Sequence, residues 1–242
     1  MTPVTYAADG DAGVLRLDDG KANAINPAWL DAAEAALDVA EADATTALVV
    51  LGRRGFFSAG LDLAVLPTLP PAAMHAVSRR FVALVVRLFL FPKPTFAAAD
   101  GHALAGGFML YCAADVRLAV DEPRARFGLT ELAAGVPVVG PTAAVVASVL
   151  RPRDLGEVLL HGRRLTAAEA HERGVVHALV ADADALHPAA RARVAALYGL
   201  DLRAHAATKA ALRRPLVAAA EAAAADVAAL LPSGNPLAGR GR

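Results

Sequence analysis

Two similar stretches decide the fold of this chain, FFSAGLDL at residues 56–63 and DGHALAGGFM at residues 100–109. Each follows a short apolar run typical of a buried strand, residues 47–51 in the first case and 95–99 in the second. Each then passes through a glycine-containing loop toward a helix start. Helix N-termini present unpaired N–H groups, and glycine lets a ligand approach the backbone closely. Two such loops, placed together, could aim two N–H donors at one oxygen.

The segments around these loops predict an α/β protein. Strands are expected at 14–17, 47–51, 95–99 and 116–119, and helices at 28–42, 72–91 and 106–114. Beyond about residue 142 the strand signals thin out, and helices are expected at 142–150, 152–160, 166–173, 189–197 and 202–231, the last interrupted near Pro215. The alternation of strands and helices favours a largely parallel sheet with right-handed crossovers.

Composition excludes several classes of partner. Lys plus Arg and Asp plus Glu each total 24, so nothing favours binding to nucleic acid or to an anionic membrane. The apolar run 81–91 is too short to span a bilayer, and residues 1–13 lack the pattern of a signal peptide. We therefore expect a cytoplasmic protein. A single cysteine, Cys112, and scattered histidines predict neither an intramolecular disulfide nor a metal site.

Four motifs, in order along the chain, resemble those of the crotonase (enoyl-CoA hydratase/isomerase) family. Residues 57–63 resemble its F-(S/C)-A-G-x-D-(L/I) element, and residues 100–108 resemble its N-G-x-A-x-G-G-G segment. GKANAIN at 20–26 resembles the N-terminal (K/R)-x-N-A-(L/I) motif, and HGRRLTAAEA at 161–170 resembles a later T-G-x-x-(L/I)-(S/T)-A-x-E-A segment. The resemblance extends from about residue 4 to residue 209.

The resemblance implies a fold and an assembly. The fold would be the crotonase spiral of repeated ββα units over residues 1–185, followed by a helical oligomerisation region at 186–231 and a flexible tail at 232–242. It also implies a homotrimer or a hexamer. The ligand would be an acyl-CoA thioester, and no separate cofactor is expected because coenzyme A is part of the substrate.

The resemblance also assigns residues to the site. The backbone N–H groups of Leu61 and Gly106 would form an oxyanion hole. The substrate-binding positions would be Lys21, Ala22, Ala24, Ala59, Gly60, Met109 and Lys209. Among these, Lys21 and the backbone of Ala22 and Ala24 would line the CoA channel, and Lys209 would reach the CoA phosphates. For Lys21 and Lys209, an ordinary solvated surface lysine is an equally good interpretation.

The acid–base groups distinguish branches of the family. Hydratases of the family use two glutamates, but here the first position is Met109, which cannot move a proton. The second position falls in FGLTEL, residues 127–132, and gives Glu131. Its apolar neighbours predict a carboxyl pKa raised by desolvation. The alternative is a structural glutamate, satisfied by backbone N–H groups near a helix start.

A single glutamate beside an oxyanion hole suits proton shuttling better than addition of water. The sequence GLTE at 128–131 also resembles the G-L-N-E stretch of the Δ3,Δ2-enoyl-CoA isomerase branch. We therefore predict an isomerase that moves a 3-enoyl-CoA double bond to the 2 position, with Glu131 as the base. The alternatives are an enoyl-CoA hydratase with an atypical site and a non-catalytic acyl-CoA-binding protein.

Overall fold

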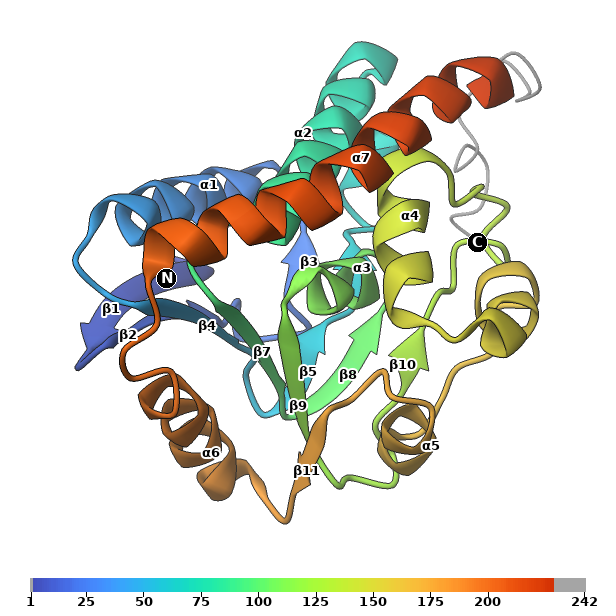
Figure 1. Cartoon of the computed structure of the whole chain (residues 1–242). Coiled ribbons are helices and arrows are strands. Elements are labelled where there is room, and N and C mark those ends of the chain that lie inside the picture. The colour runs from blue at the N-terminus through green and yellow to red at the C-terminus, as the bar shows by residue number, and fades with distance from the viewer. Residues whose placement is uncertain (1, 229–242) are drawn as a thin grey trace.

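The computed structural model describes residues 2–228 and contains one large sheet and two small ones (Figure 1). The large sheet has the strand order β1-β2-β4-β7-β9-β11. Its strands are β1 (Val4–Asp9), β2 (Ala12–Leu17), β4 (Ala47–Leu51), β7 (Thr95–Ala99), β9 (Val116–Val120) and β11 (Ala178–Val180). Only β1 and β2 pair antiparallel, and the other neighbours in this sheet pair parallel. The expected, largely parallel sheet is confirmed.

The two small sheets carry the glycine-containing stretches. One sheet joins β10 (Phe127–Gly128), β8 (Gly101–Leu104) and β5 (Gly55–Ser58), and the other joins β3 (Ala24–Ile25) to β6 (Gly60–Leu61). Along the chain, strands of the large and small sheets are followed by the helices α1 (Pro27–Ala42), α2 (Pro71–Phe89), α3 (Gly106–Ala113) and α4 (Gly140–Val149). The order is β2-β3-α1, β4-β5-β6-α2, β7-β8-α3 and β9-β10-α4. This is the expected repetition of ββα units.

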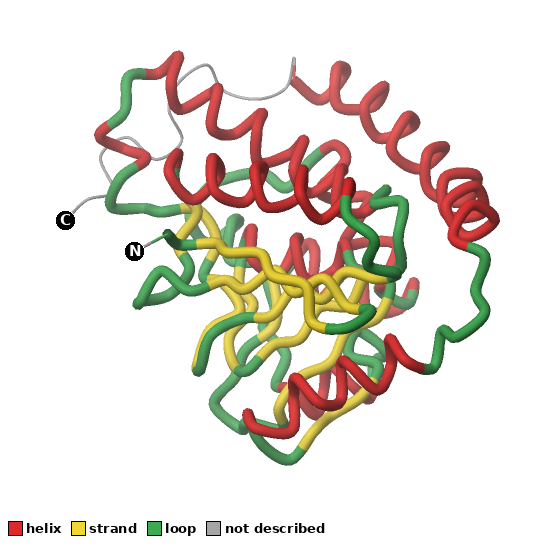
Figure 2. Tube along the Cα trace, turned by 90° about the vertical axis from the view of Figure 1, so that its left-hand side faces the viewer, coloured by secondary structure: helices red, strands yellow, loops and turns green. Residues whose placement is uncertain are grey.

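The large sheet is covered by helices on both faces, as Figure 2 shows. Successive side chains of a strand point to opposite faces. In β4, Leu48 and Val50 join the core formed with α1 (Pro27–Ala42), α2 (Pro71–Phe89) and α3 (Gly106–Ala113), whereas Val49 and Leu51 join the core beneath α6 (Ala183–Ala195). Burial on both faces explains why β4 is a continuous apolar run instead of an alternating one.

Several predicted elements are confirmed. The strands 47–51 and 95–99 are found with the predicted bounds, and α1 begins at Pro27 with Asn26 as its N-cap. Between α3 and α6 lie two further α-helices, α4 (Gly140–Val149) and α5 (Ala167–Glu172). The capping box of Thr166 and Glu169 is present at the start of α5.

Other predictions are wrong. Residues 152–160 form a 3₁₀ turn, Pro152–Asp154, and a π-helical turn, Gly156–Leu160, instead of one helix. Helix α6 begins at Ala183, ahead of Pro188, because Asp182 caps it by accepting the N–H of Ala185. Strand β11 was not predicted.

The expected interruption near Pro215 is also wrong, because α7 runs without a break over Leu202–Ala228. Pro215 removes one helix hydrogen bond, but it lies on the exposed side, where water can reach the carbonyl group left without a partner. The expected end of this helix at residue 231 and the tail 232–242 lie outside the described residues. The predicted domain boundary after residue 185 falls within α6, which packs against the large sheet.

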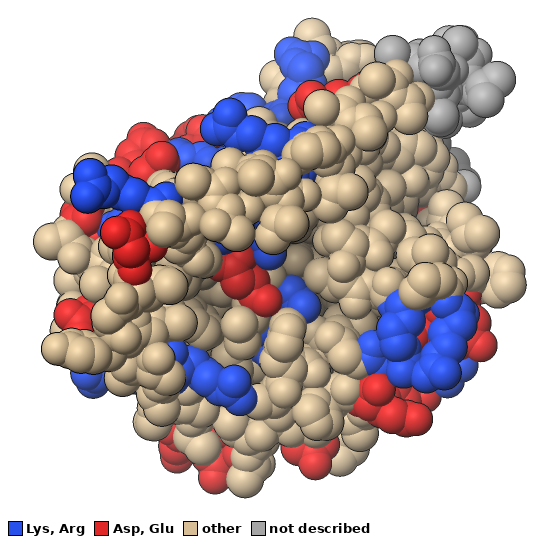
Figure 3. Space-filling model, in the orientation of Figure 1, with Lys and Arg blue, Asp and Glu red and all other residues tan. Residues whose placement is uncertain are grey.

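Among the described residues, no helix is long and apolar enough to cross a bilayer. On the face shown in Figure 3, acidic and basic side chains are mixed and do not form one broad basic surface.

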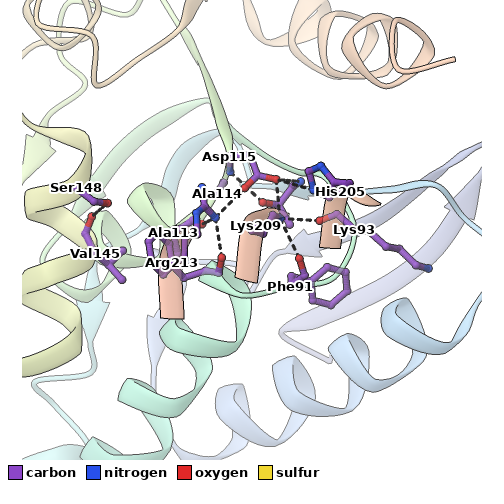
Figure 4. A network of polar contacts seen from close by, with 12 residues as sticks. Phe91, Lys93, Ala113, Ala114, Asp115, Val145, Ser148, His205, Lys209 and Arg213 are labelled. Atoms are coloured by element: carbon purple, nitrogen blue, oxygen red, sulfur yellow. Dashed lines mark hydrogen bonds and ion pairs between the residues drawn. The ribbon is translucent and has the colours of Figure 1, made fainter. Parts of the chain in front are cut away.

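An ion cluster attaches α7 to the core (Figure 4). The Asp115 carboxylate, between α3 and β9, lies 2.7 Å from Lys209 Nζ and 2.8 Å from Arg213 Nη1. It also accepts the N–H of Thr95 at 2.8 Å. Lys209 is buried, and its ammonium group donates to the carbonyl oxygens of Phe91 and Lys93 as well. Burial lowers the pKa of Lys209, and the Asp115 carboxylate opposes this effect.

We expect Asp115→Ala to destabilise the protein by about 3–5 kcal/mol, because it leaves the buried Lys209 cation without its counter-ion. The free energy of unfolding from urea titration measures this loss. Asp184→Ala is the control, since it breaks an exposed ion pair with Arg54 and removes a charge from the first turn of α6, which together should cost no more than about 1 kcal/mol. An Asp115→Ala variant as stable as this control would contradict the role of the cluster.

Candidate active site

A cavity of about 220 Å³ lies where the two glycine-containing stretches meet α2 and the turn after β10. It is lined by Ala59, Leu61, Leu63, Leu66, Met74, His75, Ser78, Ala105, Thr130, Glu131, Ala134 and Val136. Most of these side chains are apolar. Among the described lining residues, Glu131 is the only carboxylate, so one acid–base group of this type faces an apolar pocket.

Glycine allows the two stretches to meet. A Cβ atom added to Gly60 would lie 2.8 Å from the backbone nitrogen of Gly106 and 2.7 Å from the Cβ atom of Ala105. A Cβ atom on Gly107 would lie 2.2 Å from the carbonyl oxygen of Ser58. Both positions therefore require glycine, and the backbone on either side of the contact approaches closely.

This contact brings together the two backbone groups that sequence analysis selected. Leu61 follows Gly60 directly and lines the cavity. Gly106 is the first residue of α3, where the backbone N–H has no partner within the helix. Just before it, Ala105 lines the cavity and has a φ of 52°, a conformation that is unusual for a residue other than glycine. The strained loop positions the start of α3 at the pocket.

Asn23 holds the first stretch in place, a role that sequence analysis missed. It is fully buried, and its Nδ2 donates to the carbonyl oxygens of Leu17 and Phe57, each at 3.0 Å. Its own carbonyl oxygen accepts the Ser58 hydroxyl at 2.7 Å. Its φ of 52° is one that asparagine tolerates better than most residues. These bonds link the 20–26 motif to the 56–63 stretch, and the asparagine in that motif was the available signal.

Glu131 is partly buried in the turn after β10. Its Oε2 accepts the backbone N–H of Thr130 at 2.9 Å. Burial raises the pKa of the Glu131 carboxyl, while hydrogen bonds from the backbone N–H groups of Glu131 and Thr130 act in the opposite direction. A carboxyl with a raised pKa is better matched to proton transfer near neutral pH than an exposed one.

Three other residues were predicted to bind the substrate, namely Ala59, Ala24 and Lys21. Ala59 lines it, and its N–H donates to the carbonyl oxygen of Ala22 at 2.9 Å. Ala24 pairs with Gly60 in the two-stranded sheet, so the 20–26 segment lies beside the pocket. Lys21 is exposed on the same loop.

Two further predicted positions, Met109 and Lys209, are buried. Met109 is buried in α3 and is not among the lining residues. The prediction that Lys209 reaches the CoA phosphates does not fit this structure, because its ammonium group is buried against Asp115. In the part of the chain that the structure describes, no group of three or more His, Cys, Asp or Glu could hold a metal ion.

Comparison with known proteins identifies the relatives of this chain. The family profile described as enoyl-CoA hydratase/isomerase matches residues 10–231. A putative enoyl-CoA hydratase of Thermus thermophilus is 35% identical over 190 residues, covering 74% of this chain and 72% of the relative.

Solved structures show the same fold. An enoyl-CoA hydratase/isomerase family protein of Pseudomonas syringae superposes with a TM-score of 0.86 at 30% identity, covering 93% of this chain and 96% of the other. A Mycobacterium tuberculosis structure described as an enoyl-CoA isomerase gives a TM-score of 0.85 at 28% identity, covering 95% of this chain and 98% of the other. The fold is therefore the crotonase fold, and the chain belongs to the enoyl-CoA hydratase/isomerase family.

Proposed function

We propose that the protein isomerises 3-enoyl-CoA to 2-enoyl-CoA, with Glu131 as the single base. The observation that carries this proposal is that Glu131 is the only carboxylate among the described residues of the pocket. Met109 occupies the position where hydratases of the family have their first glutamate, and its thioether cannot exchange a proton. Moving a proton between two carbon atoms of one substrate requires one acid–base group, and the Glu131 carboxylate is such a group.

In the proposed reaction, the thioester carbonyl oxygen accepts the N–H groups of Leu61 and Gly106. The Glu131 carboxylate removes a proton from C2, and the electron pair of the C–H bond moves toward the carbonyl oxygen to give a dienolate. Glu131 then returns the proton at C4, which leaves the double bond between C2 and C3. Removing one donor from an oxyanion hole typically costs about 3–4 kcal/mol of transition-state stabilisation, so these two N–H groups supply much of the catalysis.

The CoA portion would follow the 20–26 segment, with Lys21 and the backbone of Ala22 and Ala24 along the channel. Coenzyme A is part of the substrate, so the proposed reaction needs no additional cofactor. We also propose that the chain acts in the cytoplasm as a homotrimer or a hexamer.

Hydration of 2-enoyl-CoA is the second candidate. It is favoured by the names of the sequence relatives, which include a putative enoyl-CoA hydratase of Thermus thermophilus. In that reaction Glu131 would have to activate the water and also supply the proton for C2. A protein that binds acyl-CoA without turnover is the third candidate, and the raised pKa of Glu131 in an apolar pocket argues against it.

Glu131→Gln should reduce isomerase activity by at least about 100-fold, because a general base contributes roughly 10²–10⁴-fold to a rate. The assay follows conversion of 3-hexenoyl-CoA to 2-hexenoyl-CoA by mass-resolved chromatography. A parallel reaction starts from 2-hexenoyl-CoA and measures addition of water. A variant with full isomerase activity, or a wild-type protein that hydrates faster than it isomerises, would contradict the proposal.

A stability measurement shows whether Glu131→Gln loses activity through unfolding. The pKa of Glu131 is raised in the folded state, so ionising this carboxyl at neutral pH costs folding free energy. Glutamine carries no charge and removes that cost. The midpoint temperature of unfolding at pH 7 should therefore stay the same or rise, and a large decrease would indicate a structural role instead.

The pH profile provides an independent prediction. The base must be deprotonated, so kcat should fall as the pH falls through the pKa of Glu131. Because burial raises this pKa, the fall should begin at a higher pH than the ordinary glutamate value of about 4.3 would give. Rates measured between pH 4 and pH 8 test this, with unfolding followed in parallel. A rate that stays constant down to pH 4 would rule out a perturbed base.

A further inference from the structure

We infer that the methyl group of Ala105 excludes substrates with a branch at C2, so that the site takes acyl-CoA thioesters whose C2 is an unbranched CH2 group. The inference rests on the proposed function, because it narrows the substrate class of the same site. It makes Ala105 a specificity-determining residue, which contacts the substrate at the reacting carbon without donating a hydrogen bond or moving a proton.

The backbone of Ala105 has a conformation that suits glycine. Its φ of 52° and ψ of −130° lie outside the left-handed α region that other residues enter, whereas glycine adopts such angles readily. In the part of the chain that the structure describes, Ala105 and Asn23 are the two residues other than glycine with a positive φ. The family motif N-G-x-A-x-G-G-G also has glycine at this position. The chain therefore carries a methyl group where backbone geometry alone favours a hydrogen atom.

The methyl group lies beside both backbone donors. Ala105 lines the cavity and directly precedes Gly106, the second donor. A Cβ atom added to Gly60 would lie 2.7 Å from the Cβ atom of Ala105, so the methyl group also lies against the residue that precedes Leu61, the first donor. A thioester carbonyl oxygen that accepts both N–H groups is therefore brought next to this methyl group.

Ala105 is also tied to the segment that carries the base. Its N–H donates to the carbonyl oxygen of Gly128 at 2.9 Å, and Gly128 is the last residue of β10. Glu131 follows three residues later and lines the same cavity as Ala105. In the proposed complex the carbonyl oxygen lies at the two N–H groups and the C2–H bond points at Glu131, so C2 lies between the donors and the carboxylate. A substituent on C2 would therefore meet the Ala105 methyl group.

The methyl group cannot move aside for a branched substrate. The Ala105 carbonyl oxygen accepts the N–H groups of Phe108 and Met109 at 2.9 and 3.1 Å, which fixes the peptide at the start of α3. Alanine has no side-chain rotamer through which a larger residue would yield. Forcing one extra methyl group into a filled site typically weakens an interaction roughly five- to 150-fold. A branch at C2 should therefore lower kcat/KM by at least about tenfold.

The experiment compares 3-hexenoyl-CoA with racemic 2-methyl-3-hexenoyl-CoA in the wild-type protein, Ala105→Gly and Ala59→Gly. Ala59→Gly is the matched control, because Ala59 is also a partly buried alanine that lines the cavity, but its φ is not positive. The measured quantity is the preference for the linear substrate, expressed as the ratio of the two kcat/KM values. Comparing this ratio between proteins cancels the intrinsic effect of the methyl group on the acidity of C2.

The wild type should prefer the linear substrate by at least about tenfold, and Ala105→Gly should reduce this preference by about tenfold. In Ala59→Gly the preference should stay within about twofold of the wild-type value, whatever happens to the two rates. An Ala105→Gly variant with the wild-type preference would overturn the inference. An equal loss of preference in both variants would also overturn it, because general loosening of the cavity would then explain the result.

Binding of saturated acyl-CoAs separates this inference from the proposed function. Hexanoyl-CoA and 2-methylhexanoyl-CoA cannot isomerise, so their dissociation constants, measured by calorimetry, do not depend on proton transfer by Glu131. Tighter binding of hexanoyl-CoA that is lost in Ala105→Gly supports the inference even if no enoyl-CoA is turned over. Equal affinity of the wild type for both, with intact isomerase activity, overturns the inference and leaves the proposed function standing.

The thermal stability of the same two variants tests the strained position of Ala105. Glycine at an ordinary φ destabilises the folded state, because the unfolded chain gains conformational freedom. At Ala105 the relief of strain offsets this loss. The midpoint temperature of unfolding should therefore fall in Ala59→Gly and stay the same or rise in Ala105→Gly. An equal fall in both variants would overturn the inference, since the methyl group of Ala105 would then serve packing alone.

Discussion

The close approach of two backbone segments at Gly60 is the constraint on which the site depends. Any side chain at Gly60 would collide with the backbone nitrogen of Gly106, and a side chain at Gly107 would collide with the carbonyl oxygen of Ser58. The parallel strands of the large sheet deliver both stretches to the same side of the molecule. Glycine then lets the strand ends touch, and the buried amide of Asn23 fixes the first of them. The apolar pocket lies beside this contact, and Glu131 lines it from the turn after β10.

Part of the fold could be predicted because some elements carry a recognisable signal in their own sequence. The strands 47–51 and 95–99 are continuous apolar runs, and Asn26 and Pro27 mark the start of α1. The short strands β3 and β6 could not be predicted, since two residues carry no periodicity and each forms only by pairing with the other. Pro215 misled the prediction of α7 because its effect depends on whether solvent reaches the neighbouring carbonyl group.

The site could be predicted in outline. The motifs located Leu61 and Glu131, which both line the cavity, and indicated the apolar surroundings that raise the pKa of the carboxyl. They did not reveal the role of Asn23, because the bond that ties it to the first stretch goes to the carbonyl group of Phe57, 34 residues away in the sequence. The expectation that Lys209 reaches the CoA phosphates came from the family resemblance, but its ammonium group is buried against Asp115 here.

In the proposed reaction, the backbone contact at Gly60 places two N–H donors where the enolate forms, and Glu131 supplies the carboxylate. A crystal structure of the complex with hexanoyl-CoA tests this most directly, because the unreactive thioester reports where the carbonyl oxygen and C2 lie. We predict a carbonyl oxygen about 3 Å from the backbone nitrogens of both Leu61 and Gly106, with the Glu131 carboxylate adjacent to C2. A thioester bound away from these two nitrogens, or with C2 out of reach of Glu131, would contradict the account.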